Sequence, residues 1–446
     1  MGTVSSFGRT FTGEQRALGR EDAVALLASG RAPAGGLLGY GNGRSYGDSC
    51  LNQVGAVADM RGASRILHFD PAAGIVEAEA GVLLGDIIAL GAPYGYFPPV
   101  VPGTQWVTLG GAIANDVHGK NHHRRGTFGA HVEAIELLRS DGQAYDCSAD
   151  RHGALFRATI GGMGLTGLIL KASIRLMPVA SLDIEQKVRP FGEVAAFFDM
   201  AEQADADNEY AVAWIDQLAS GRHAGRGLLL TGNHAQDGAR GYDAAPGRLS
   251  VPLQPPFSVL NRPFLKAFNA AYRWKTARAA GRVGARGFFF PLDGVGDWNR
   301  LYGPRGLHQH QSVVPEDAAR EAVPALLAAA RKAGQGSFLT VLKRFGGQQS
   351  PGLLSFPRPG YTLTLDFPDR GTATRALLGE LDRITVAAGG AVNPYKDARM
   401  SADTFEASFP NWRALEAARD PAFMSDFWRR TAMRLAEGGS MPLAAE

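Results

Sequence analysis

The sequence contains few cysteines and no long apolar stretch. Cys50 and Cys147 are the only thiols among 446 residues, which is too few for a disulfide framework and lacks the spacing of a zinc site. No run reaches the roughly 18 apolar residues that a transmembrane helix needs. The first twelve residues lack the apolar core of a signal peptide. We therefore expect a cytoplasmic protein and leave contact with a membrane surface open.

The chain also lacks a large excess of charge of either sign. The chain has 46 Lys and Arg against 43 Asp and Glu, a formal net charge of +3, and this balance is too mild to indicate nucleic-acid binding. Glycine is instead abundant, with 57 residues against an average share of about 7%. Tight turns around a ligand explain this composition better than a helical bundle does. The length allows two or three domains of roughly 150 residues each.

Four of these glycines lie in residues 39–48, G-Y-G-N-G-R-S-Y-G-D, after a short apolar run that can end a strand. Glycine lets the backbone approach a ligand closely, and successive N–H groups in such a turn form a concavity that suits a pyrophosphate. Arg44 adds a planar cationic donor. The stretch predicts a nucleotide-cofactor loop, although a glycine-rich surface turn has the same pattern.

A second stretch of small residues, at 101–114, supports the cofactor interpretation. Thr108 can cap a helix that begins near Gly110, and the N–H groups at such a helix start favour an anion. Two separate loops that both suit phosphate are harder to explain as plain turns.

Residues 162–167, G-M-G-L-T-G, match the dinucleotide fingerprint G-x-G-x-x-G literally. That fingerprint needs a strand before it and a helix after it. Here a helical pattern at 155–159 comes first and a strand follows, so we exclude a Rossmann nicotinamide site. A turn that passes beside a flat cofactor stays open.

Three histidines, His118, His122 and His123, resemble metal ligands at first sight. His118 and His122 are spaced to share a helix face, but Gly119 and Asn121 between them make a poor helix. No glutamate stands between the two histidines as in H-E-x-x-H. We therefore expect no metal and predict a polar loop that lines a ligand cavity.

Hydrophobic periodicity and turn residues predict most of the regular elements. Helices are predicted at 21–29, 82–90, 315–333 and 372–388, and after residue 390. Strands are predicted at 56–60, 65–69, 74–80 and 167–177, with a hairpin formed by 132–138 and 144–147.

Residues 257–290 differ from their surroundings, because seven Lys and Arg occur there with interleaved aromatic residues and without one acidic residue. A basic amphipathic segment of this kind can touch anionic lipid or a lipid-phosphate substrate. A solvated helix with inward aromatic residues has the same composition, since charge runs usually face water. Both interpretations stay open.

Four blocks occur in a specific order: G-N-G-R-S-Y-G-D, then P-G-T with V-T-L-G-G-A-I-A-N-D-V-H-G-K-N-H-H, then G-G-M-G-L-T-G, then N-P-Y-K-D-A-R. With the further blocks at 308–315, 337–346 and 354–361, the sequence resembles the decaprenylphosphoryl-β-D-ribose oxidase family, part of the vanillyl-alcohol-oxidase-like group of FAD oxidoreductases. The resemblance spans about residues 20–440.

The resemblance implies an α+β, two-domain FAD-binding fold of the vanillyl-alcohol-oxidase type. A discontinuous FAD domain would comprise residues 1–179 and 391–446. A substrate domain of residues 180–390, an antiparallel sheet with helices, would cap the flavin.

It also implies two sets of site residues. The set expected to hold FAD is Gly39, Tyr40, Gly41, Asn42, Gly43, Arg44, Ser45, Tyr46, Gly47, Asp48, Ser49, Gly103, Thr108, Leu109, Gly110, Gly111, Asn115, His118, Ile169 and Asn393. The set expected to bind substrate is Tyr46, Lys120, Gln309, Gln311, Lys343, Thr364 and Lys396.

Within these sets, Lys396 is the expected essential cation near the flavin and the reacting hydroxyl, and His118 is the second catalytic candidate, for proton transfer. Lys343 and Gln311 would orient the sugar or its phosphate. Composition alone favours a plainer interpretation of Lys396, as a surface lysine in a charged turn.

The chain departs from the family at several positions. Thr364 stands where actinobacterial members have a cysteine, and a hydroxyl without an activating base is a poor nucleophile. Asn393 stands where a tyrosine is common, and Asn42 and Trp106 also differ. Relatives with covalent flavin carry a histidine near the position of Arg44, so we expect non-covalent FAD.

The activity implied is oxidation of the 2-hydroxyl of a polyprenyl-phosphoryl pentose, ribose in the family, to a ketone. A separate NAD(P)H-dependent keto-reductase would then complete an epimerisation toward an arabinose donor for the cell envelope. Oxidation of a soluble sugar, alditol or glycoside is the alternative, and a non-catalytic flavoprotein is a third hypothesis.

Overall fold

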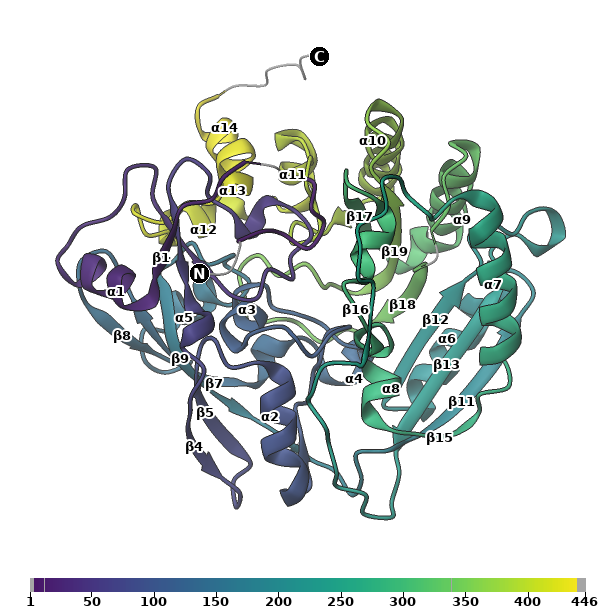
Figure 1. Cartoon of the computed structure of the whole chain (residues 1–446), viewed down its shortest axis with the longest axis horizontal. Helices are drawn as coiled ribbons and strands as arrows, with labels where there is room; N and C mark the ends of the chain where they lie inside the picture. Colours follow the sequence, from purple (N-terminus) through teal and green to yellow (C-terminus); the bar gives the residue numbers. More distant parts are fainter. Residues whose placement is uncertain (1–3, 12, 338, 439–446) are drawn as a thin grey trace.

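Two antiparallel sheets lie on opposite sides of the molecule in the computed structural model, which describes residues 4–11, 13–337 and 339–438 (Figure 1). The first has five strands in the order β4-β5-β9-β7-β8 and the second has eight in the order β15-β11-β13-β12-β18-β19-β17-β20. Helices and antiparallel sheets together make an α+β fold, as the sequence predicts.

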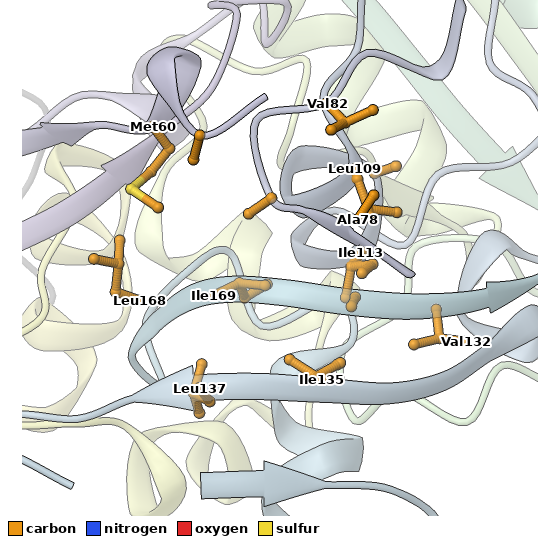
Figure 2. Close-up of a cluster of buried hydrophobic side chains, with 14 of the residues drawn as sticks. Met60, Ala78, Val82, Leu109, Ile113, Val132, Ile135, Leu137, Leu168 and Ile169 are labelled. Carbon is orange, nitrogen blue, oxygen red and sulfur yellow. The ribbon is translucent and has the colours of Figure 1, made fainter. Parts of the chain in front are cut away.

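The five-stranded sheet buries one face against short helices. It consists of β4 (Ile66–Asp70), β5 (Ile75–Glu79), β7 (Val132–Leu138), β8 (Ala144–Cys147) and β9 (Leu168–Arg175). Figure 2 shows Ile113 of α3 (Leu109–Ala114) among Ala78, Ile135 and Ile169 of the strands. Because α3 is pinned by this core, its first turn is held in a fixed place.

A small parallel sheet stands beside the first. It is formed by β1 (Ala17–Gly19), β3 (Ala56–Asp59) and β2 (Leu37–Tyr40), in that order, next to α1 (Arg20–Ala28). Nearby elements are α2 (Leu84–Gly91), α5 (Gly153–Thr159), and the pair β6 (Tyr96–Phe97) and β10 (Met177–Pro178). The glycine-rich loop begins at the end of β2.

The eight-stranded sheet has two unlike faces, because side chains alternate along each strand. On β19 (Gly360–Pro368), Leu363, Leu365 and Phe367 belong to a buried core that includes α6, α9 and α10. Thr362, Thr364 and Asp366 lie on the other face of the strand. The sheet therefore presents polar side chains toward the middle of the molecule.

The bounds of its remaining elements follow. The strands are β11 (Ile184–Phe191), β12 (Tyr210–Ile215), β13 (Gly227–His234), β15 (Gly281–Val283), β17 (Leu307–Val314), β18 (Val341–Phe345) and β20 (Ala391–Val392). The covering helices are α6 (Val194–Asp207), α9 (Glu316–Lys332) and α10 (Thr372–Ala387), and α7 (Arg262–Thr276) and α8 (Ala285–Phe289) lie elsewhere on this side. A separate pair, β14 (Leu249–Ser250) and β16 (Val295–Gly296), is parallel.

The C-terminal part of the chain returns to the first sheets. Helices α11 (Ala402–Ser408), α12 (Trp412–Ala418), α13 (Asp426–Arg430) and α14 (Ala432–Ala436) follow β20. Their buried Trp412 and Trp428 belong to the same core as Leu38 and Val57 of the small parallel sheet. Residues far apart in the sequence are thereby packed around the loop that follows β2.

The predicted elements are confirmed to within about two residues, but α6 is a helix that the sequence interpretation missed. Glu193 precedes α6 and makes no side-chain capping bond, so the usual start signal of a helix is lacking. Phe197 and Phe198 are adjacent large apolar residues, a pattern that is typical of a buried strand. Among the described residues, no helix combines the length and apolar character that crossing a membrane requires.

Candidate active site

A cavity of about 900 Å³ lies between the two sheets. This volume is near the upper end for small-molecule and cofactor sites. The glycine loop, the start of α3 and the turn before β9 line one end, and β17, β18, β19 and the segment after β20 line the other. The two ends differ in what they offer a ligand.

The glycine loop packs directly on the start of α3. A Cβ at Gly41 would lie 2.4 Å from the Thr108 hydroxyl oxygen, and that hydroxyl accepts a hydrogen bond of 3.2 Å from Gly111 N, which caps α3. Gly43 has φ +59° and a Cβ there would lie 2.3 Å from the Tyr40 hydroxyl. The two loops therefore form one corner where only glycine fits, and its N–H groups suit an anion.

Arg44 lines this corner and has an unused donor. Its Nε is buried and has no hydrogen-bond partner among the described residues. Burial lowers the pKa of Arg44, while Asp293 opposes that effect. Because a buried donor is normally paired, an anionic group of a ligand is the partner that this site lacks.

The G-x-G-x-x-G stretch forms a turn in the same wall. Met163, Gly164 and Gly167 line the cavity, and the strand β9 follows, not a helix. The predicted order of helix, turn and strand is confirmed, and a Rossmann fingerprint needs the opposite order. Ile169, expected on the adenine side, also lines the cavity.

The other end of the cavity is a set of polar side chains on neighbouring strands. Gln309 and Gln311 lie on β17, and Gln311 pairs in register with Thr364 of β19. Lys343 lies on β18, opposite Thr362. The antiparallel register therefore brings the predicted substrate residues onto one face.

His118 is the centre of a hydrogen-bond network at this end. Gln311 Nε2 donates to His118 Nε2 at 3.1 Å, and Lys343 Nζ lies 3.2 Å from His118 Nδ1. Asn393 fixes the orientation of the amide, since its Nδ2 donates to Gln311 Oε1 at 2.9 Å. A neutral imidazole carries one proton, so His118 Nδ1 holds it and donates to an uncharged Lys343 amine.

The pKa values of this network agree with that assignment. Burial, and then the charge of Lys343, lower the pKa of His118 well below its usual value. Burial, and then Lys120 and Lys396, lower the pKa of Lys343 to about 7. Both groups are therefore able to be uncharged near neutral pH.

Lys396 lies in the segment after β20 and reaches over Tyr46 of the glycine loop. Its Nζ is 4.3 Å from the centre of the Tyr46 ring. Burial lowers the pKa of Lys396 to about 8, and the charge of Asp366 opposes this effect. The lysine is therefore a cation at neutral pH that loses its proton readily.

Asp366 lies behind the cavity wall, in contact with Gln309, and the sequence interpretation missed it. Its carboxylate is fully buried and accepts a hydrogen bond of 2.6 Å from Gln309 Nε2. Burial raises the pKa of Asp366 to about 7. The alternation in T-L-T-L-D puts Asp366 on the same face as Thr364, and that signal could have identified it.

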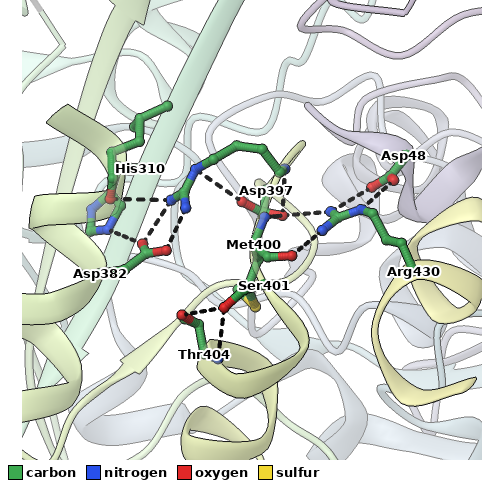
Figure 3. Close-up of polar contacts among 10 residues, drawn as sticks. Asp48, His310, Asp382, Asp397, Met400, Ser401, Thr404 and Arg430 are labelled. Carbon is green, nitrogen blue, oxygen red and sulfur yellow. Dashed lines mark hydrogen bonds and ion pairs between the residues drawn. The ribbon is translucent and has the colours of Figure 1, made fainter. Parts of the chain in front are cut away.

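A chain of buried ion pairs holds the Lys396 segment in place (Figure 3). Arg430 Nε lies 2.6 Å from Asp48, and Arg430 Nη2 lies 2.6 Å from Asp397, the residue after Lys396. Arg399 bridges Asp397 and Asp382. The last link is His310 of β17, whose Nε2 lies 3.1 Å from Asp382. One network thus ties the glycine loop, the lysine segment and the eight-stranded sheet together.

Of the residues predicted to hold a cofactor, Gly47, Asp48 and Leu109 do not line the cavity. A Cβ at Gly47 would lie 1.4 Å from the Asp397 carbonyl oxygen, so this glycine permits the contact with the lysine segment. Asp48 belongs to the ion-pair chain, and Leu109 is in the apolar core. All other predicted cofactor and substrate residues line the cavity.

The remaining histidines lie behind the cavity wall. His122 packs on the Phe345 ring at 4.4 Å between centres, and burial lowers its pKa to about 3. His123 Nδ1 lies 3.5 Å from Asp205. The residues with defined positions contain no group of three His, Cys, Asp or Glu side chains arranged to hold a metal ion.

Comparison with known proteins decides the family. The family model described as an FAD binding domain matches residues 20–148. Decaprenylphosphoryl-beta-D-ribose oxidase of Mycolicibacterium smegmatis is 36% identical over 418 residues, which cover 89% of each chain. This chain belongs to the decaprenylphosphoryl-β-D-ribose oxidase family. It is an FAD-dependent oxidoreductase, as expected from its motifs.

Two other relatives match this oxidase family member over different shares of its length. An uncharacterized Streptomyces coelicolor protein is 38% identical over 380 residues, which cover 78% of this chain and 99% of the relative. Cytokinin dehydrogenase 7 of rice is 32% identical over 142 residues, 31% of this chain and 27% of that protein. The glycine corner and the unpaired Arg44 donor fit the pyrophosphate of FAD.

Proposed function

We propose that the chain oxidises the 2-hydroxyl of a polyprenyl-phosphoryl ribose to the 2-keto sugar. The observation that carries the proposal is the combination of three lysines and an apolar arm in one cavity. Lys120, Lys343 and Lys396 line it, and none forms an ion pair within 4 Å among the described residues. Lys120 and Lys343 have neutral hydrogen-bond partners, the Phe288 and Gly119 carbonyls among them, but no counter-ion. Buried amines without a counter-ion favour an anionic ligand such as a sugar phosphate.

We call the part of the cavity lined by the eight-stranded sheet and α7 the apolar arm. Its walls are formed by Val212, Trp214 and Leu230 of the sheet and by Phe268 and Tyr272 of α7. The Trp214 and Tyr272 rings are 4.9 Å apart. Walls of this composition can bind an apolar prenyl chain, and a free sugar or alditol has no apolar chain to bind there. We therefore favour the lipid-linked substrate.

We propose the following roles for the chain in this reaction. FAD, when bound, supplies the acceptor for the hydride that leaves the carbinol carbon. Lys396, as a cation, stabilises the negative charge that develops on the reacting oxygen. His118 is the candidate acceptor of the hydroxyl proton because it is neutral, although its Nε2 must first exchange Gln311 for the substrate.

The other two lysines are proposed to hold the phosphate. Lys343 reaches into the cavity beside His118, and Lys120 lies 4.5 Å from the centre of the Phe288 ring. Burial lowers the pKa of Lys120 to about 7. A phosphate between the two amines restores their charge, so substrate binding and protonation are coupled.

We propose that FAD is held without a covalent bond. Relatives with covalent flavin carry a histidine near the position of Arg44, and an arginine cannot form that bond. Cys50 also lines the cavity, but burial raises its pKa to about 12, so the reactive thiolate is lacking. Acid precipitation tests this: yellow colour should stay in the supernatant, and colour in the pellet would contradict it.

The division of labour between the two parts of the chain is also a proposal. Residues 1–179 with 391–446 would hold FAD, and residues 180–390 would cap the flavin and hold the substrate. The product, a 2-keto sugar, would pass to a separate NAD(P)H-dependent keto-reductase that completes an epimerisation toward an arabinose donor for the cell envelope. A lipid-linked substrate fits a cytoplasmic protein in peripheral contact with a membrane.

Anaerobic bleaching of the flavin tests the substrate. A short-chain prenyl-phosphoryl riboside should bleach the bound flavin, and the matched 2-deoxyriboside, which lacks the reacting hydroxyl, should not. Xylitol and a riboside without the phosphate serve as soluble competitors for the same assay. Bleaching by xylitol but not by the lipid-linked riboside would overturn the proposal.

A further inference from the structure

The helix α7 has two faces with different environments. Phe268, Tyr272 and Thr276 line the cavity, and Leu265 is buried. On the opposite side, Ala267 and Trp274 are exposed and lie seven residues, or two turns, apart, so they share one face. One helix therefore forms the wall of the apolar arm and an outer surface of the molecule.

The outer surface exposes unusually large apolar side chains. Trp274 is 64% exposed and Phe264, near the start of the same helix, is 45% exposed. Large aromatic residues normally lose most of their exposure on folding. In Figure 1, α7 lies on the side of the molecule away from the five-stranded sheet.

The same surface carries uncompensated positive charge. Lys266 and Arg273 flank the exposed face, and Arg278 stacks on Trp274 with 4.6 Å between its guanidinium and the ring centre. None of these three forms an ion pair with the described residues. Arg273 Nε is also buried without a hydrogen-bond partner, in a hollow that Arg226, Trp274 and Arg278 help to line.

We infer that the outer face of α7 docks on an anionic lipid bilayer. Basic side chains beside an exposed tryptophan on a helix that lies flat are the features that bind headgroups and the interface together. A second copy of the chain would bring the same positive charge against itself at a two-fold contact. A nucleic acid offers nothing apolar for the alanines of this face.

This docking also explains the position of the apolar arm, a point that rests on the proposed lipid-linked substrate. The inner face of α7 lines the arm, so a helix seated on the bilayer places the arm beside the lipid phase. A prenyl chain could then move from the bilayer into the arm without crossing water.

Sedimentation with vesicles tests the inference. The wild-type holoprotein should bind phosphatidylglycerol vesicles and should bind phosphatidylcholine vesicles at least tenfold more weakly. The Trp274→Ala variant should bind about tenfold more weakly, and the Lys266→Glu, Arg273→Glu double variant more than twentyfold, since each basic residue is worth about fivefold. The Trp274→Phe variant should lose the blue shift of fluorescence that vesicles cause.

Matched surface variants control for general effects. Tyr94→Ala removes another exposed aromatic residue, and Lys332→Glu reverses an exposed charge at the end of α9; both should bind vesicles as the wild type does. No vesicle binding, equal binding by the α7 and control variants, or concentration-dependent self-association that the α7 variants abolish in place of vesicle binding, would overturn the inference. Flavin bleaching by a short-chain riboside tests the substrate separately, because it needs no bilayer and the α7 variants should retain it.

Discussion

The two ends of the cavity recognise their ligands with different parts of the chain. The glycine corner offers backbone N–H groups and the guanidinium of Arg44. The strand end offers lysine, glutamine and histidine side chains, and burial shifts the pKa values of the lysines and the histidine. The first end is selective for shape and the second for charge and proton content.

This difference predicts which property of the protein a substitution at each end of the cavity should change. A substitution in the glycine corner adds atoms where the backbone has no space, so it should affect folding and cofactor retention. A substitution at the strand end leaves the backbone alone and changes charge, so it should affect turnover and its pH dependence. Predictions that separate these effects follow, beginning with the largest.

Lys396→Met should cause the largest change at the strand end. We expect turnover to fall about 10³-fold, the range for loss of a group that acts in the transition state, while the yellow flavin is retained. Turnover and flavin absorbance are measured on the same preparation. Lys187→Met, at an exposed position of β11, is the control, and equal activity of the two variants would contradict the role of Lys396.

Arg430→Met should break the link between the two ends. It leaves Asp48 and Asp397 buried without their partner, and such a loss costs about 3–5 kcal/mol of unfolding free energy. Denaturant unfolding measures it. Arg413→Met removes an exposed pair, 3.1 Å from Glu406, and should cost at most about 1 kcal/mol. Similar losses of unfolding free energy in the two variants would show that the buried ion-pair network stabilises the fold no more than an exposed ion pair does.

Gly43→Ala should act on the glycine corner alone. The positive φ and the short approach to Tyr40 predict a loss of about 1–3 kcal/mol and weaker retention of FAD. Thermal unfolding with and without added FAD measures both effects. Gly62→Ala has open space around the new methyl group and should leave both unchanged; a loss as large as that of Gly43→Ala would refute the argument.

The pH profile should report on Lys396 and Asp366. If Lys396 acts as a cation with a pKa of about 8, kcat/KM is maintained below that pH and falls about tenfold per unit above it. Asp366 raises this pKa, so Asp366→Asn should move the fall to lower pH. A rate that rises through pH 8 would instead assign Lys396 the role of a neutral base.

Thr364→Cys should have the smallest effect on turnover, within about twofold, because the two side chains are similar in size. It should nevertheless create a site for thiol-directed reagents. Burial raises the pKa of Cys50 to about 12 and of Cys147 to about 11, so the wild type should stay unlabelled. Mass spectrometry of the labelled proteins measures the difference, and equal labelling would contradict it.

The difference between the glycine corner and the strand end also explains which site residues could be predicted from the sequence. The glycine corner is local, and residues 39–48 with Thr108 carry their chemistry in the order of the chain. The strand end depends on register: Gln311, Thr364 and Lys343 meet only because β17, β19 and β18 pair as they do. Resemblance to a family located these residues, whereas spacing alone could not.

Asp366 and the ion-pair chain were missed for a related reason. A buried carboxylate has no signature apart from its strand alternation, and the sequence does not state which face is buried. The partners Asp48 and Arg430 are separated by 382 residues, so no local pattern links them. Such contacts follow from the packing of the C-terminal helices against the small parallel sheet.

The contact between Gly47 and the Asp397 carbonyl has a consequence for how the protein is made. The glycine-rich turn after β2 is synthesised early, but the segment with Lys396 and its anchor Arg430 is made almost last. A nascent chain can therefore shape the glycine corner long before the site is complete. Productive loading of the flavin must wait until α13 has left the ribosome.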